Sequence, residues 1–148
     1  MRALLGLLLV TTVTLAQPRT LSSYAFVNED GSLRISNRNV HLYGILIPPT
    51  GTTCRSNVRP VSCGSRAELA LEFRIGARFV RCEVRDTNPD GSLVATCRVD
   101  DTDLAAYLLE RGWAAAAPDA PPMYAVLERI ARSRGLGVWG TPADRIVD

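Results

Sequence analysis

The residues best suited to chemistry lie in and between two predicted turns of the chain. Glu29 and Asp30 stand in the first turn, Asp90 stands in the second, and His41 is the single histidine. Turn carboxylates can hold a hard cation such as calcium through oxygen, and a histidine can serve as a general base near neutral pH. The structural alternative is that Asp-Gly pairs simply form hairpin turns and that the histidine belongs to the fold or the surface.

The positive charge of the chain comes entirely from arginine. All 17 residues counted as lysine or arginine are arginines, and 15 acidic residues leave a formal charge of +2. Such a balance gives no general attraction to nucleic acid. Arginines do bind phosphate or carboxylate where several converge, although most lie on a solvated surface. The candidates for such an arginine face are Arg55, Arg59, Arg66 and Arg81.

The first residues have the composition of a signal peptide. Arg2 supplies a positive start, an uncharged stretch rich in leucine follows, and Thr14-Leu15-Ala16 is a small-x-small cleavage site. We expect residues 1–16 to be removed, which leaves 17–148 as a single domain. A retained anchor is the alternative, although a spanning helix needs about 20 apolar residues. The sequence therefore predicts a periplasmic or secreted protein.

A hairpin is expected in the middle of the chain. Residues 77–86 and 92–100 are rich in β-branched and apolar residues, and the Asn-Pro-Asp-Gly sequence at 88–91 is a strong turn signal. If the first and last residues of that turn pair, Cys82 lies directly opposite Cys97. Because an exported protein meets an oxidising compartment, these two cysteines are predicted to form a disulfide.

The two other cysteines are predicted to pair with each other, because Cys82 and Cys97 are already paired. Cys54 and Cys63 would close a short loop as the second disulfide. Neither C-x-x-C spacing nor partner histidines are present, so a redox or metal role is disfavoured.

Other elements follow from periodicity and from capping signals. The apolar alternation predicts strands at 23–28, 32–36 and 39–46, with a loop over 48–64. Helices are predicted from Ser65 to Gly76, from the Asp101–Asp103 cap to Gly112, and from Pro121-Pro122 to Gly135. The chain is thus expected to form five strands, with one helix between the third and fourth strands and two further helices after the last. This order predicts an α+β fold with a mainly β core, arranged as a small barrel.

Seven short motifs follow one another along the chain. They are DGSLRI (30–35), VHLYGI (40–45), CG (63–64), VRC (80–82), LVATC (93–97), DLA with GWA (103–105 and 112–114) and GLGVW (135–139). In this order and with these gaps, the motifs resemble the staphylococcal nuclease-like (thermonuclease-like) family in its exported, cysteine-containing branch. The resemblance covers a core of about residues 25–139. The resemblance implies an OB-type five-stranded barrel with three helices and calcium-assisted hydrolysis of phosphodiester bonds in DNA and RNA.

The positions that carry the family chemistry are degenerate here. The resemblance places Gly31 and Leu46 at two metal-binding carboxylates and Pro49 at the glutamate that acts as the general base. His41 and Ser92 stand where the family has arginines aimed at phosphate. Leucine and proline can neither bind a cation nor take a proton. The sequence therefore predicts no bound metal and no cofactor.

These losses favour a catalytically inactive domain that acts as a binding or structural module in the cell envelope. Its cleft would be apolar, lined by Leu46, Ile47 and Pro49, and would suit a protein or peptide partner. Two alternatives stay open. One is a residual phosphodiester hydrolase that uses His41 and the carboxylates of the first turn. The other is metal-independent binding of nucleic acid or an anionic polysaccharide through the arginine face.

Overall fold

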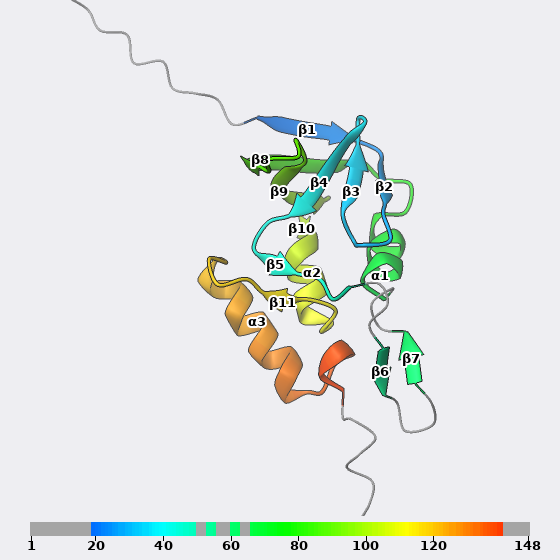
Figure 1. Ribbon diagram of the computed structural model, residues 1–148, viewed down its shortest axis with the longest axis vertical. Helices are drawn as coiled ribbons and strands as arrows, with labels where there is room; N and C mark the ends of the chain where they lie inside the picture. The colour runs from blue at the N-terminus through cyan, green and yellow to red at the C-terminus, as the bar shows by residue number, and fades with distance from the viewer. Residues whose placement is uncertain (1–18, 50–52, 56–59, 63–65, 141–148) are drawn as a thin grey trace, which may run out of the picture.

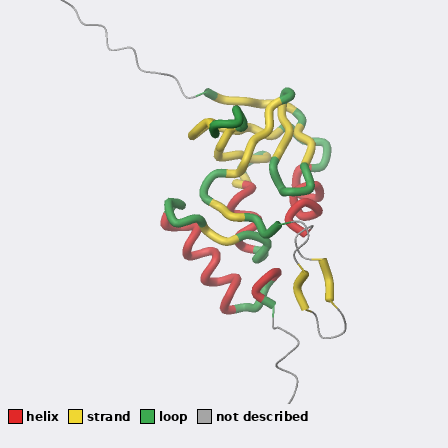
Figure 2. Tube along the Cα trace, in the orientation of Figure 1, coloured by secondary structure: helices red, strands yellow, loops and turns green. Residues whose placement is uncertain are grey.

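The protein combines a curled sheet with helices gathered at one end of it (Figure 1). The computed structural model describes residues 19–49, 53–55, 60–62 and 66–140. Strands outnumber helices, and the sheet forms a nearly closed barrel (Figure 2). The described helices are α1 (Arg66–Ile75), α2 (Leu104–Glu110) and α3 (Pro122–Ser133), followed by the short 3-10 turn η1 (Gly137–Trp139). The predicted α+β fold with three helices on a barrel is confirmed.

The barrel sheet runs in the order β1-β8-β9-β4-β3-β2, with β10 paired to β9. Neighbouring strands are antiparallel except β4 and β9, which run parallel. The strands are β1 (Thr20–Ser23), β2 (Ala25–Val27), β3 (Leu33–Ile35), β4 (Arg38–Leu42), β8 (Val80–Thr87), β9 (Leu93–Val99) and β10 (Thr102–Asp103).

One bent segment nearly closes the barrel. The apolar alternation predicted a single strand at 23–28, but strand pairing begins at Thr20 and breaks at Tyr24. The first half, β1, pairs with β8, and the second half, β2, pairs with β3. The two edges of the sheet thus belong to one continuous stretch of chain, which is why five predicted strands suffice to build the barrel.

The central hairpin has the predicted register where the cysteines lie. Cys82 pairs with Cys97 and forms a disulfide. Closer to the turn the register differs, because the Asn88 N–H donates to the Ser92 carbonyl at 2.8 Å. A bulge in β8, between Val84 and Asp86, inserts one extra residue into that strand. This insertion offsets the shift at the turn, so that the pairs from Val84 to Val80 have the predicted register.

The predicted loop at 48–64 contains further strands. β6 (Thr53–Arg55) pairs with β7 (Pro60–Ser62), so the prediction of an uninterrupted loop is wrong. The backbone pairing sets Cys54 opposite Val61. Cys63 lies outside the described residues, and the Cys54–Cys63 bridge therefore stays a prediction.

A second small sheet joins the barrel to the helices. β5 (Ile45–Leu46) pairs with β11 (Ala115–Ala116), two strands that the sequence analysis did not separate from their surroundings. Helix α2 begins as predicted, since Asp103 accepts hydrogen bonds from the N–H groups of Ala105 and Ala106. Helix α2, almost wholly buried, packs between the barrel and α3.

Candidate functional site

Two turns of nearly identical sequence flank β4 at one end of the barrel. They are Asn-Glu-Asp-Gly-Ser-Leu at 28–33 and Asn-Pro-Asp-Gly-Ser-Leu at 88–93. In each turn the asparagine amide donates to the serine hydroxyl at 2.9 Å, and the serine hydroxyl donates to the aspartate Oδ1 at 2.6 Å. Leu33 and Leu93 both pair with Val40, from opposite sides. The repeated six-residue pattern is visible in the sequence, but it was not used to predict this pair of turns.

The serine side chains favour the ionised form of both turn aspartates. Hydrogen bonds from the Ser92 hydroxyl and N–H lower the pKa of Asp90 below its ordinary value. Partial burial works against ionisation of Asp30, but the same pair of bonds from Ser32 outweighs it and lowers that pKa too. A protonated His41 would add a smaller effect of the same sign at both carboxylates. Each aspartate thus uses Oδ1 to hold its own turn together.

A cleft of about 280 Å³ lies between the first turn and β5. Its walls are mainly aliphatic, from the end of β4 and the segment 45–47, and Leu46 is 58% exposed. Asp30, Ser32 and His41 supply its polar edge. This volume is smaller than the about 300–1,000 Å³ of typical small-molecule pockets, so the cleft suits one inserted side chain.

Ile47 covers Gly31, the residue that the family resemblance aligns with a metal-binding carboxylate. A Cβ added at Gly31 would lie 2.6 Å from Ile47 Cδ1, and the residue has φ +78°. A side chain at position 31 would therefore displace Ile47 and strain the backbone. Leu46, which the resemblance aligns with a second metal-binding carboxylate, is an exposed aliphatic residue. Calcium does not fit this donor set, because among the described lining residues Asp30 alone carries a carboxylate.

The structure brings together some of the predicted site residues and separates others. Gly31, His41, Leu46 and Ile47 line the cleft. Pro49 is exposed beyond β5 and Ser92 is buried in the second turn, so neither lines it.

The predicted arginine face can be followed only in part. Arg66 begins α1, whereas Arg81 lies on β8 beside a different hollow that also includes Arg98. Arg59 and the side chain of Arg55 lie outside the described residues. The sequence analysis did not single out Arg98.

Neither a metal cluster nor a bilayer-crossing helix is found in the described part of the chain. There, no three histidine, cysteine, aspartate or glutamate side chains converge to hold a metal ion. The helices described are also too short or too polar to span a bilayer.

Comparison with known proteins gives one informative similarity. No protein-family model matches the chain. The chain is 29% identical over 140 residues to the succinoglycan biosynthesis protein ExoI of Rhizobium meliloti (strain 1021). The alignment covers 92% of this chain and 72% of that protein, so the similarity extends over nearly the whole barrel and its helices. The barrel itself is consistent with the OB-type fold that the motif order implies.

Proposed function

We propose that the protein is an exported, non-catalytic domain of nuclease-like fold that binds a peptide segment of an envelope protein in the cleft beside β5. The observation that carries the proposal is the packing of Ile47 over Gly31, which turns the family's metal position into apolar surface. The resemblance aligns Leu46 and Pro49 with the other two carboxylates, and neither leucine nor proline can bind calcium or activate water.

The shape and charge of the cleft define the kind of peptide it would take. One aliphatic or aromatic side chain fills the cavity against Ile45, Leu46 and Ile47. Asp30 is exposed at the rim, and its Oδ2 makes none of the hydrogen bonds that hold the turn. An apolar residue followed by a lysine or arginine would satisfy both features, because the basic group would face Asp30.

The envelope setting rests on two further supports. The Cys82–Cys97 disulfide suits an oxidising compartment, in keeping with the signal-like sequence of residues 1–16. The similar protein ExoI is named for the biosynthesis of a glycan, succinoglycan. We therefore place the partner of this domain in the assembly of an envelope glycan.

A pair of leucine variants tests the cleft. Tagged protein without residues 1–16 is used to capture partners from a periplasmic extract, and captured proteins are identified by mass spectrometry. Leu46→Asp should abolish capture of the specific partner, because a charge at the cavity rim would be desolvated on binding. Leu69→Asp, at a 49% exposed leucine on α1, is the matched control and should leave capture intact. Changing Arg55 and Arg59 to Ala should also matter little.

The absence of catalysis is tested separately. Purified protein is incubated with single-stranded DNA and RNA in calcium, with and without a chelator. We expect no cleavage above background. Cleavage that a chelator abolishes would refute the non-catalytic part of the proposal and favour the residual hydrolase.

In the capture experiment, capture that survives Leu46→Asp but disappears with added salt would refute peptide docking.

A further inference from the structure

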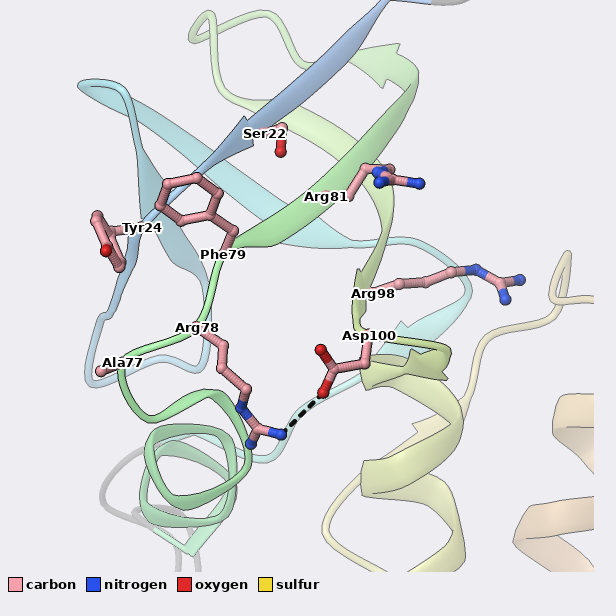
Figure 3. A pocket seen from close by; sticks show the side chains of 8 residues that line it. All are labelled: Ser22, Tyr24, Ala77, Arg78, Phe79, Arg81, Arg98 and Asp100. Atoms are coloured by element: carbon pink, nitrogen blue, oxygen red, sulfur yellow. Dashed lines mark hydrogen bonds and ion pairs between the residues drawn. The ribbon is translucent and has the colours of Figure 1, made fainter.

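A second hollow, of about 470 Å³, opens on the outer face of the barrel and shares no lining residue with the cleft. Figure 3 shows Tyr24 and Phe79 on one side of it and Arg81 and Arg98 on the other, with both guanidinium groups directed away from the rings. The hollow thus has an aromatic wall on one side and two arginines at its opposite rim.

The aromatic wall is a pair of rings outside the core. Tyr24 and Phe79 meet edge to face, with ring centroids 4.5 Å apart and an interplanar angle of 80°. Each residue is 58% exposed, so the pair leaves apolar ring surface in water. Two rings at this angle form a corner that fits the side of a compact ring, whereas stacked nucleic-acid bases use flat parallel platforms.

The cationic wall carries uncompensated charge. Arg81 and Arg98 are direct cross-strand partners on β8 and β9, an arrangement in which like charges repel. Within the described residues neither side chain has a hydrogen bond or an ion pair.

The nearby carboxylates are already occupied. Asp100 pairs with Arg78 at 3.0 Å, as the dashed line in Figure 3 marks. Asp103, which is opposite Arg98 in the β9–β10 register, accepts from two backbone N–H groups of α2 and from the Tyr124 hydroxyl. An external anion would relieve the repulsion between Arg81 and Arg98.

We propose that this hollow binds an acidic sugar unit of an anionic polysaccharide. The apolar face of the sugar ring would pack into the corner of Tyr24 and Phe79. Its carboxylate would accept hydrogen bonds from Arg81 and Arg98, whose exposed side chains would turn toward the bound sugar. The chain's formal charge of only +2 argues against nucleic acid, whose binding relies on many phosphate contacts. The site is independent of the proposed peptide cleft, because the two share no residue.

The test measures binding of oligogalacturonate by calorimetry, with a neutral dextran oligomer and a single-stranded oligothymidylate as comparison ligands. The native protein should bind oligogalacturonate, with an affinity that falls as salt increases, and should bind dextran and oligothymidylate much more weakly. Replacing Arg81 and Arg98 by Ala should weaken binding by at least about tenfold. Replacing Arg129 and Arg134 by Ala on and after α3 removes the same charge elsewhere and should change the affinity less than about twofold.

The aromatic wall is tested by one phenylalanine variant and a matched control variant. Phe79→Ala should weaken binding several-fold, whereas Phe73→Ala, at an 86% exposed ring on α1, should have no effect. Because the double arginine variant loses a repulsive pair, its thermal unfolding midpoint should not fall below that of the native protein. If it does fall, the single change Arg81→Gln, which keeps the side-chain bulk, replaces it in the binding test.

Three results would overturn the proposal. The first is no binding of oligogalacturonate by the native protein. The second is equal loss of affinity in the hollow and control variants. The third is tighter binding of oligothymidylate than of oligogalacturonate, which would assign the hollow to nucleic acid instead.

Discussion

The Cδ1 atom of Ile47 lies 2.6 Å from the position that a Cβ of residue 31 would occupy. The first turn and the segment after β5 therefore fit together only because residue 31 is a glycine. The second turn has the same backbone form at Gly91, with φ +84°, but nothing lies within 4 Å of a Cβ there. A comparison of the two turns therefore separates two effects of adding a side chain: the strain of a positive φ, which both positions share, and the clash with Ile47, which occurs only at position 31.

Alanine at each glycine should reveal that difference. Gly91→Ala should lower the free energy of unfolding by roughly 1 kcal/mol, the cost of a positive φ for a residue with a side chain. Gly31→Ala should cost up to about 1 kcal/mol more, since the end of Ile47 must move aside. Urea denaturation measures both losses, and the methyl NMR signal of Ile47 should shift only in Gly31→Ala. Equal losses with an unmoved methyl signal would contradict the packing.

The serine hydroxyls should control the titration of their aspartates. Ser92→Ala should raise the pKa of Asp90 toward 3.8 and leave Asp30 unchanged, and Ser32→Ala should do the reverse. Because both folded-state pKa values are lowered, the associated stabilisation is present at neutral pH and is lost as pH falls through them. Carboxyl NMR titration reports each pKa. A shift of the distant aspartate would show that the turns are coupled rather than independent.

Tyr124 should make stability depend on alkaline pH. Its hydroxyl donates to Asp103 Oδ2 at 2.7 Å, and burial followed by this bond raises its pKa above the ordinary 10.0. The unfolded tyrosine ionises first, so the contribution is complete below pH 10 and declines as pH rises above it. Tyr124→Phe should cost about 1 kcal/mol at pH 8 and reduce the decline above pH 10.

Urea denaturation across this pH range provides the measurement. Tyr24→Phe, at an exposed ring, serves as the control and should keep the native pH dependence. An unchanged alkaline decline in Tyr124→Phe would show that other groups cause it.

The two predicted disulfides should differ in their effect on stability. Cys82 and Cys97 are buried in the barrel and join adjacent central strands. Replacing both by Ala should cost about 3 kcal/mol through loss of the cross-link. The loss from replacing Cys54 and Cys63 should be smaller, because their bridge would close a shorter loop. Non-reducing peptide mapping checks both pairings, and equal losses of stability would contradict the ranking.

The parts of the fold that depend on local sequence could be predicted. Turn residues and β-branched runs predicted the central hairpin, and its register placed Cys82 opposite Cys97. The same register pairs Arg81 with Arg98, so the arginine side of the second hollow could have been predicted from the sequence. Its aromatic half was not, since Tyr24 meets Phe79 only because the segment of β1 and β2 bends at that point.

The remaining differences arise from pairings between distant or weakly patterned segments. Thr20–Ser23 shows little apolar alternation and becomes a strand only through pairing with β8. Leu46 and Ile47 line the same cleft, whereas Pro49 does not, because the segment leaves the cleft after residue 47. That Ile47 covers Gly31 depends on three-dimensional packing that no local pattern encodes.

The parallel pairing of β4 with β9 also has a kinetic consequence. Both hairpins that contain the twin turns join strands close in sequence, whereas pairing Val40 with Leu93 closes a loop through α1 and the whole segment before β8. Loop-closure entropy must be overcome before such a contact contributes. We therefore expect the pairing of β4 with β9 to form late in folding, so that substitutions between these two strands slow folding more than substitutions in either turn.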